Sequence, residues 1–336
     1  MQNLTAADAL IYDPGVVNLI LAQQVNTRAR VIEQPNLTAP RKAVKDQVEM
    51  EHWERCQISD GLAMVKFIRW LKTAVGKERI TELSAAAKVN QLRMADPLCI
   101  GPSFPPIVAY REHAAMMHYR PTPETTYELA AEGLLLVDSG GQYYSGTTDI
   151  TRTIVLGQLN AQARNDFTWV LKSHIALATA KFLYGTTGSN IDIMARAPLW
   201  QHGIDYKCGT GHGVGFFLNV HEGPQTIRQT LSPVKLEANM IVTNEPGIYR
   251  EGKHGIRTEN MLRIVRDESN EFGQFMKFQT LTVCPIDTAG VNPALLSKDE
   301  IQWLNRYHQY VYAKLSPHLT EAESIWLAEA TRPLSL

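Results

Sequence analysis

The chain has 336 residues, of which 44% are hydrophobic and 20% charged, and its formal net charge is −1. This composition is typical of a folded globular protein with one large domain or two ordinary ones. The balanced charge argues against a nucleic-acid partner or a membrane surface, and we find no apolar run long enough to span a bilayer. The four cysteines, Cys56, Cys99, Cys208 and Cys284, show no paired spacing, so we expect a cytoplasmic protein.

The N-terminal part of the chain predicts little core and then two helices. Residues 1–40 predict a strand, a helix and a second strand, which are too few elements to bury a core. We interpret this segment as the remnant of a preceding N-terminal domain. From Asp46 onward, apolar residues recur at helical spacing through Trp53 to Leu71, and a second helix is expected from Thr81 to about Met94.

The stretch LLLVDSGGQYYSGTTDITRT, residues 134–153, holds the first candidate site residues. The apolar run before Asp138 predicts a buried strand. A following extended segment places Asp149 and Thr151 on one face and Arg152 on the other. A buried carboxylate needs a partner, and a metal ion would provide one for both aspartates. The alternative is two ordinary turn aspartates at strand ends.

Further helices are expected in the second half of the chain. Periodic apolar residues predict a helix from Asp166 to Phe182, and another from near Ser189, which would be capped by Ser189 with Asp192 reaching back. From Ser297 the chain is again helical, with one apolar face formed by Ile301, Leu304, Tyr307 and Val311. We therefore expect a main domain over 41–287 and a helical C-terminal extension over 288–336.

Three more residues extend the candidate metal site. His212 lies between two glycines in GTGHGVG, Glu245 closely follows the apolar run 240–242, and Glu259 lies within a predicted strand, where a lone carboxylate would be costly. With Asp138 and Asp149 they provide four carboxylates and one imidazole. This donor set suits Mn²⁺, Co²⁺, Fe²⁺ or Zn²⁺. Its four negative charges balance two divalent ions, the arrangement that activates water between two metals.

The motifs VDSGGQYYSGTTDITRT, GTGHGVGFFLNVHEGP, NEPGIY and GIRTEN resemble the pita-bread metallopeptidase family, and within it the Xaa-Pro aminopeptidases (aminopeptidase P). The likeness extends from about Lys42 to the C-terminus. It implies an α+β fold with a curved, mainly antiparallel sheet and helices on its outer face. It also implies that most of the family's N-terminal domains are missing from this chain.

The resemblance also implies a role for each candidate site residue. The metal ligands would be Asp138, Asp149, His212, Glu245 and Glu259, binding two divalent ions, with Mn²⁺ preferred. The expected catalytic residues are Glu245, His118, His221 and Arg257, and the last three also match substrate-binding positions. Cys208 stands where the family often has a histidine, so we expect it to contact the substrate rather than a metal, with a plain buried thiol as the alternative.

The implied reaction is hydrolysis of the N-terminal Xaa-Pro bond by a hydroxide that bridges the metals, with Glu245 as proton shuttle. The substrate would be a peptide with proline at its second position. Two alternatives stay open, a prolidase that cleaves only dipeptides and a non-catalytic pita-bread binding module. The sequence also leaves open the preferred first residue and the oligomeric state, with a homodimer as one alternative.

Overall fold

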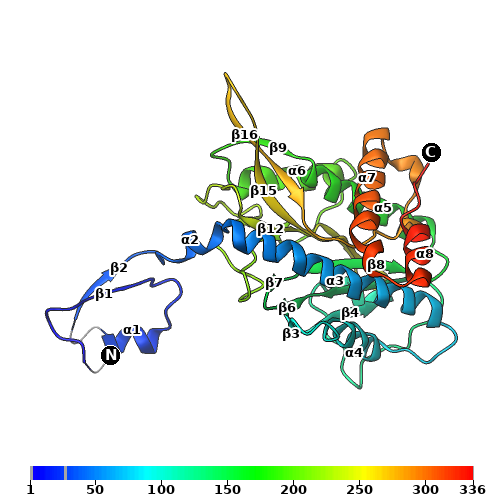
Figure 1. The fold of residues 1–336 in the computed structure, drawn as a ribbon, viewed down its shortest axis with the longest axis horizontal. Helices are drawn as coiled ribbons and strands as arrows, with labels where there is room; N and C mark the ends of the chain where they lie inside the picture. The colour runs from blue at the N-terminus through cyan, green and yellow to red at the C-terminus, as the bar shows by residue number, and fades with distance from the viewer. Residues whose placement is uncertain (1–2, 26–28, 336) are drawn as a thin grey trace. The chain divides into compact units, whose positions relative to one another are not determined.

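The computed structural model describes residues 3–25 and 29–335, and the chain forms two compact units, Met1–Lys42 and Ala43–Leu336 (Figure 1). The first unit contains β1 (Ala9–Tyr12), α1 (Leu19–Val25) and β2 (Arg30–Glu33), the order that was predicted, and its two strands pair in parallel. Among its described apolar side chains Val25 is buried, whereas Val16, Leu19 and Ile20 are exposed. This unit therefore has almost no core of its own. The short helix α2 (Ala39–Ala43) lies at the boundary.

Two capped helices open the second unit, as predicted. α3 (Gln47–Ala74) begins after Asp46, whose side chain accepts a hydrogen bond from the backbone N–H of Glu49 in a capping box. A second capping box at Thr81 starts α4 (Glu82–Arg93). The apolar face of α3 is buried and includes Trp53, Met64, Phe67 and Leu71.

One group of strands carries the aspartates. β4 (Ile107–Tyr110), β5 (Leu134–Ser139) and β8 (Ile150–Val155) form an antiparallel sheet in the order β4-β5-β8. All of β5 is buried, and its register places Asp138 opposite Thr151. The segment that joins β5 to β8 contains β6 (Gly141–Tyr143) and β7 (Gly146–Thr147), which form a second antiparallel sheet with β3 (Cys99–Pro102).

The other strands surround the predicted histidine and glutamates. β12 (Ile241–Asn244), β15 (Asn260–Asn270), β16 (Gly273–Thr280) and β9 (Lys181–Leu183) form a four-stranded antiparallel sheet in that order. β10 (Gly211–His212) pairs with β11 (Thr226–Ile227), and β13 (Gly247–Arg250) with β14 (His254–Arg257). A backbone hydrogen bond of 3.1 Å from Glu259 N to Thr151 O links the β15 side to β8. All of these pairs are antiparallel, in agreement with the predicted α+β class.

The helix predicted from Asp166 to Phe182 is displaced towards the N-terminus. α5 (Ala161–Ala178) begins after Asn160, whose side chain caps it. The expectation was wrong at the C-terminal end because Phe182 lies in β9 and pairs with Met276 of β16. Strand pairing between distant segments therefore overrides the local helical pattern.

The predicted cap of the next helix was also wrong. α6 (Gly188–Trp200) begins after Thr187, which forms a capping box with Asn190, and not at Ser189. Asp192 does not reach back to the helix start, because its buried carboxylate accepts hydrogen bonds from Arg196 Nε at 2.6 Å and Thr210 Oγ1 at 2.5 Å. The bond from Thr210 ties α6 to the segment that leads into β10, whereas Arg196 lies within α6 itself.

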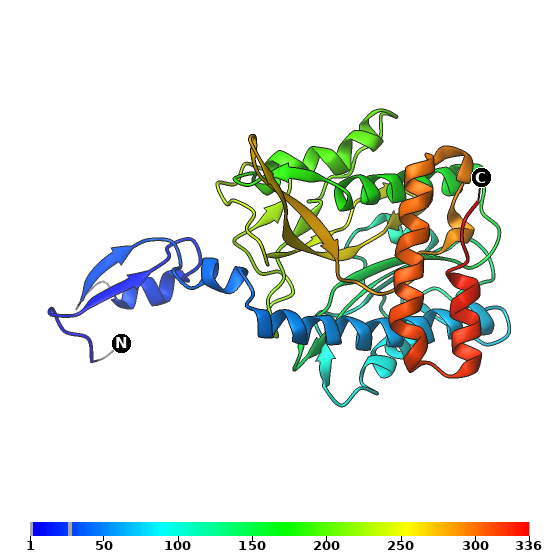
Figure 2. The ribbon, with the colours of Figure 1, turned by 45° about the horizontal axis from the view of Figure 1, so that its top comes forward.

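The C-terminal helices complete the second unit. α7 (Lys298–Leu315) begins after Ser297 and buries its predicted apolar face, and α8 (Glu321–Ala330) follows. Short 3₁₀ helices are η1 (Arg111–Ala115), η2 (Thr288–Gly290), η3 (Pro293–Leu295) and η4 (Ser316–His318). In Figure 2 most of the gold hairpin of β15 and β16 lies between the blue helix α3 on one side and the green helices α5 and α6 on the other. Every described helix is too short or too polar to cross a membrane.

Candidate active site

The five predicted metal ligands converge from separate strand ends. Asp138 lies near the end of β5 and Asp149 directly before β8, His212 lies in β10, and Glu245 and Glu259 lie directly after β12 and before β15. In three overlapping groups, one candidate donor atom from each residue lies within 4.8 Å of the other two. The groups are Asp149, His212 and His221; His212, Glu245 and Glu259; and Asp138, Asp149 and Glu259. The structure thus brings all five together.

A close approach between β10 and β12 places His212 beside Glu245. The backbone N–H of His212 donates to Thr243 Oγ1 at 3.0 Å, and that hydroxyl donates to Glu245 Oε1 at 3.0 Å. A Cβ atom at Gly211 would lie 1.9 Å from Thr243 O, so only glycine permits this spacing. As a result, His212 Nε2 lies 3.4 Å from Glu245 Oε1 and 3.3 Å from Asp149 Oδ2.

Arg257 holds Asp138 rather than only facing the substrate space. Its buried guanidinium donates to Asp138 Oδ2 at 2.5 Å, to Thr151 Oγ1 at 3.0 Å and to the Tyr249 hydroxyl at 2.7 Å. Thr151 in turn donates to Glu259 Oε2 at 2.7 Å. The hydrogen bonds around this arginine therefore join two of the predicted ligands, Asp138 and Glu259. The other oxygen of Asp138, Oδ1, is buried and has no hydrogen-bond partner.

Burial disfavours the charged forms of the carboxyl groups in the site. Burial raises the pKa of Asp149 to about 7, although the hydrogen bond with His212 acts in the opposite direction. Burial also raises the pKa values of Glu245 and Glu259. The pKa of His212 is lowered by burial, but Asp149 and Glu245 outweigh this and raise it to about 9. A buried, oxygen-rich donor set with an unpartnered oxygen fits divalent cations.

All nine predicted site residues line one cavity of about 270 Å³. His221 packs edge-on against His212 with ring centroids 4.1 Å apart, and its pKa is lowered by burial and by the charge of His212. His118 lies in the turn after η1. Cys208 is half-buried, burial raises its thiol pKa to about 11, and its carbonyl accepts a hydrogen bond from Arg196. The four predicted substrate-side residues thus line the same cavity as the ligands, namely His118, Cys208, His221 and Arg257.

A buried carboxylate anchors the segment that carries His118. Glu82, at the start of α4, accepts hydrogen bonds from the backbone N–H groups of Tyr110 and Tyr127 at 2.7 and 2.9 Å and from the Tyr119 hydroxyl at 3.1 Å. The His113 ring lies 2.9 Å from the same carboxylate through Nδ1 and stacks between both tyrosine rings, Tyr119 and Tyr127. This cluster fixes the turn on both sides of His118.

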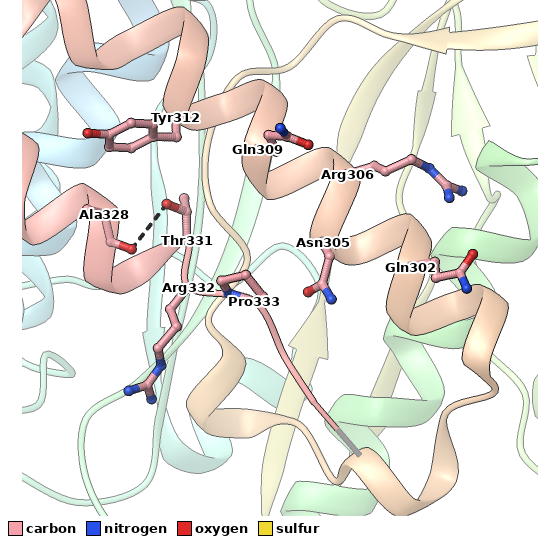
Figure 3. A pocket seen from close by; sticks show the side chains of 9 residues that line it. All are labelled: Gln302, Asn305, Arg306, Gln309, Tyr312, Ala328, Thr331, Arg332 and Pro333. Atoms are coloured by element: carbon pink, nitrogen blue, oxygen red, sulfur yellow. Dashed lines mark hydrogen bonds between the residues drawn. The ribbon is translucent and has the colours of Figure 1, made fainter.

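A larger cavity, of about 760 Å³, lies between α7 and the segment after α8 (Figure 3). In Figure 3 the Thr331 hydroxyl contacts Ala328 O, and the Asn305 side chain of α7 points towards the segment after α8. Asn305 Nδ2 donates a hydrogen bond to Leu334 O in that segment at 3.0 Å. Its lining residues include no aspartate, glutamate, histidine or cysteine. It therefore lacks the carboxylates, imidazoles and thiols that bind metal ions, and the smaller cavity is the candidate active site.

A family model of metallopeptidase family M24 matches residues 51–266, the part of the chain that contains every residue of the candidate site. The chain belongs to metallopeptidase family M24. A second model, of the C-terminal region of this peptidase family, matches residues 274–334.

Named family M24 relatives support the same assignment. Aminopeptidase P1 of Arabidopsis thaliana is 37% identical over 356 residues, covering 98% of this chain and 55% of that protein. A probable Xaa-Pro aminopeptidase P of Coprinopsis cinerea is 42% identical over 303 residues, covering 87% of this chain and 48% of that protein. The chain spans about half the length of the curated relatives it matches.

Solved M24 structures confirm the predicted pita-bread fold. The X-prolyl aminopeptidase of Caenorhabditis elegans, described as a cytosolic enzyme with a di-nuclear active site, matches with a TM-score of 0.86 and 38% identity over 92% of this chain and 51% of that chain. The prolidase of Pyrococcus furiosus matches with a TM-score of 0.68 and 25% identity, covering 82% of this chain and 76% of that chain. The curved antiparallel sheet with outer helices is therefore shown for this M24 chain.

Sequence reasoning missed the apolar part of the M24 cavity. The residues concerned are Phe104, Pro105, Ile107, Met117, Val220 and Tyr249, with Arg120 among the polar lining residues. Two of these neighbour predicted residues, Met117 beside His118 and Val220 beside His221, and that adjacency was the available signal. Phe104 and Pro105 gave no such signal, because periodicity does not show where a loop approaches a distant strand.

Proposed function

We propose that the unit Ala43–Leu336 is the catalytic unit of a metal-dependent aminopeptidase that cleaves the bond between the first residue of a peptide and a proline at the second. The observation that supports this most directly is the convergence of five ligand-type side chains on a cavity that also contains two histidines and an apolar wall. The relatives named as Xaa-Pro aminopeptidases support the same substrate class.

Two divalent ions are the proposed cofactors, held by Asp138, Asp149, His212, Glu245 and Glu259. The unpartnered Asp138 Oδ1 and the raised pKa values of the buried carboxyl groups support this assignment. We assign Mn²⁺ first, because four carboxylates make the donor set predominantly hard. Bound ions would polarise the scissile carbonyl and make water a nucleophile near neutral pH.

Glu245 is the proposed proton shuttle. Thr243 Oγ1 orients its Oε1, and its side chain is 22% exposed towards the cavity, so it can reach both the ligand cluster and a bound peptide. It would accept the proton of the attacking water and deliver it to the leaving nitrogen. His221 and His118 would donate hydrogen bonds to the carbonyl oxygen and the leaving nitrogen.

Proline selectivity follows from the rest of the cavity. The nitrogen of an Xaa-Pro bond carries no hydrogen, so an enzyme that docks its substrate through that N–H cannot align this bond. Here the apolar side chains of Ile107, Met117 and Val220 line the cavity beside the histidines. They offer a wall for the pyrrolidine ring, while ions held by the five ligand residues would bind the carbonyl oxygen and the free amino terminus.

The four free cysteines of the chain suit a reducing compartment. We therefore propose a cytoplasmic location, which the description of the nematode relative as cytosolic supports.

The likeness to a prolidase favours one second candidate, cleavage of dipeptides alone. The deciding experiment compares Arg-Pro-Pro, Arg-Ala-Ala and the dipeptide Arg-Pro at equal Mn²⁺, with bound metal determined by elemental analysis and Co²⁺, Fe²⁺ and Zn²⁺ as parallel reconstitutions. We expect rapid cleavage of Arg-Pro-Pro only. Equal rates on Arg-Pro-Pro and Arg-Ala-Ala would refute proline selectivity, and cleavage of Arg-Pro alone would establish a prolidase. A folded protein that binds none of these metals would refute the metal site.

A further inference from the structure

Arg152 is a buried cation for which the proposed reaction has no use. It is 2% exposed, and its guanidinium donates to Glu259 O at 2.6 Å and to Asn260 Oδ1 at 2.8 Å. Its other hydrogen-bond acceptors are the backbone oxygens of Thr151, Cys284 and Pro285 and the hydroxyl of Tyr307. All of these acceptors are neutral, whereas a buried cation is usually paired with a carboxylate. What Arg152 does is join segments of backbone, one of which carries Glu259.

Tyr307 connects this arginine to the C-terminal helix. It lies on the buried face of α7, and its hydroxyl accepts from Arg152 Nη2 at 2.9 Å and donates to Cys284 O at 2.8 Å. The same oxygen lies 3.4 Å from Asn260 Oδ1. Through this hydroxyl, α7 reaches the residue that directly follows Glu259 in the chain.

A second chain of contacts from α7 reaches the residues that neighbour the two glutamates. Trp303 stacks on Tyr307 with ring centroids 5.4 Å apart and meets the ring of His174 edge-on at 5.9 Å. His174 is fully buried in α5, donates from Nδ1 to Asn244 O at 3.1 Å, and accepts at Nε2 from Asn260 Nδ2 at 3.2 Å. Asn244 directly precedes Glu245, and Asn260 directly follows Glu259.

Both chains of contacts reach Asn260, which directly follows Glu259. Arg152 bonds the carbonyl of Glu259 itself, and Thr151, its neighbour in β8, accepts the backbone N–H of Glu259 at its own carbonyl. Both main-chain polar groups of Glu259 are therefore fixed, and its carboxylate is fixed separately by the Thr151 hydroxyl. A shift of α7 would move the Tyr307 hydroxyl, and with it Arg152 and its hydrogen bond to Glu259 O.

We propose that α7 is a positioning element of the active site, and that Tyr307 and Arg152 are positioning residues that hold Glu259 in its metal-binding orientation. The inference rests on the proposed function, since it takes Glu259 as a ligand. Groups that orient a metal ligand contribute to metal affinity, and their loss typically costs about 10–100-fold. The C-terminal helices then serve the metal site as well as the stability of the fold.

The test compares three proteins, the wild type, Tyr307→Phe and Tyr312→Phe. Each is freed of metal with a chelator, and its Mn²⁺ affinity is then measured by calorimetric titration. Tyr307→Phe removes one hydroxyl and keeps the ring that stacks on Trp303. Tyr312→Phe is the matched control, because Tyr312 lies on the same helix and is 37% exposed. We expect the Mn²⁺ Kd of Tyr307→Phe to rise about tenfold, and that of the control to stay at the wild-type value.

The melting temperature with and without Mn²⁺ separates positioning from a purely structural role. If Tyr307 positions Glu259, the metal-induced rise in Tm becomes smaller in Tyr307→Phe, because metal stabilises the fold in proportion to its affinity. If Tyr307→Phe lowers Tm equally with and without metal and leaves the Kd unchanged, the proposal is overturned. A wild-type chain that binds no Mn²⁺ would instead refute the proposed function, so the two failures are distinguishable.

Arg152→Lys provides the second variant, which keeps the buried charge but loses the forked geometry of the guanidinium. We expect a weaker Mn²⁺ affinity again, and in the double variant a loss smaller than the sum of the single losses, because both residues act through one network. Additive losses would contradict the coupling between α7 and Glu259. If Arg152→Lys does not fold, the comparison of Tyr307→Phe with Tyr312→Phe still decides the proposal.

Discussion

Replacing Glu245 by glutamine should change stability and activity in opposite directions. The amide keeps the size of the side chain and can still accept the hydrogen bond from Thr243 Oγ1, which is 3.0 Å long in the structure. It removes one negative charge from a cluster of four carboxylates. Because burial raises the pKa of Glu245, its charged form is disfavoured in the folded state, so the metal-free Glu245→Gln protein should melt at a higher temperature than the wild type at neutral pH.

Turnover should fall steeply in the same variant. A glutamine cannot carry the proton from water to the leaving nitrogen, and loss of a general acid–base typically costs about 10²–10⁴-fold, which corresponds to about 2.7–5.5 kcal/mol in the activation barrier. Glu245 Oε1 lies 3.4 Å from His212 Nε2, and we also propose this residue as a metal ligand, so about 10²-fold is the smallest loss that we expect.

The assay is Arg-Pro-Pro hydrolysis under saturating Mn²⁺, together with thermal unfolding in chelator. Glu251→Gln is the matched control, because it makes the same chemical change at an exposed residue in the turn after β13. The control should resemble the wild type in both measurements. A Glu245→Gln variant that retains near-normal turnover would refute the proton-shuttle role, and one that melts lower in chelator would refute the electrostatic reasoning.

Three further predictions concern the thiol, the titrating ligands and the N-terminal unit. Cys208→His should change kcat or KM and leave the amount of bound metal, measured by elemental analysis, unchanged. The reason is that the thiol lines the cavity but belongs to none of the three donor groups. Loss of metal in this variant would contradict the assignment of the ligands. In chelator, the free energy of unfolding should fall as pH rises, because the folded state raises the pKa of Asp149 from 3.8 to about 7 and that of His212 from 6.5 to about 9. Groups with raised pKa values stabilise the fold at low pH, and this effect is lost between about pH 4 and 9. Urea unfolding at pH 5, 7 and 9 measures the change, and a free energy of unfolding that rises with pH would contradict the prediction. Deleting Met1–Lys42 should leave the second unit folded, as followed by circular dichroism, because that unit has its own core clusters; an unfolded product would show that the segment belongs to the catalytic unit.

Much of this fold could be predicted from the sequence because its signals are local. The strand that ends at Asp138 is a continuous apolar run, and the helix starts at Asp46, Thr81 and Ser297 carry capping side chains that need only their own next turn. The cap at Ser189 failed for a tertiary reason. Asp192 is engaged by Arg196 and by Thr210 from a later segment, so it is not available to reach back along its own helix.

For the candidate site too, the sequence predicted what depends on local signals and missed what depends on tertiary contacts. Motif spacing indicated which side chains gather, and the strand period correctly separated Thr151 from Arg152. It did not indicate the partners across the sheet, such as Arg257 on Asp138 or Tyr307 on Arg152. Those contacts depend on which long side chains meet after the sheets close, and the sequence alone contains no periodic signal for that.

The spread of the ligands along the chain has a consequence for how the protein folds. Asp138 and Glu259 belong to segments that meet only when β8 and the β15 side are joined, and His212 arrives from a third segment. Contacts of such high sequence separation form late and slow the folding reaction. A metal ion added to the unfolded chain therefore finds no preformed set of ligands around which a nucleus could grow. Metal should leave the folding rate almost unchanged and act by slowing unfolding, so the metal-loaded protein owes its persistence to a high barrier against opening.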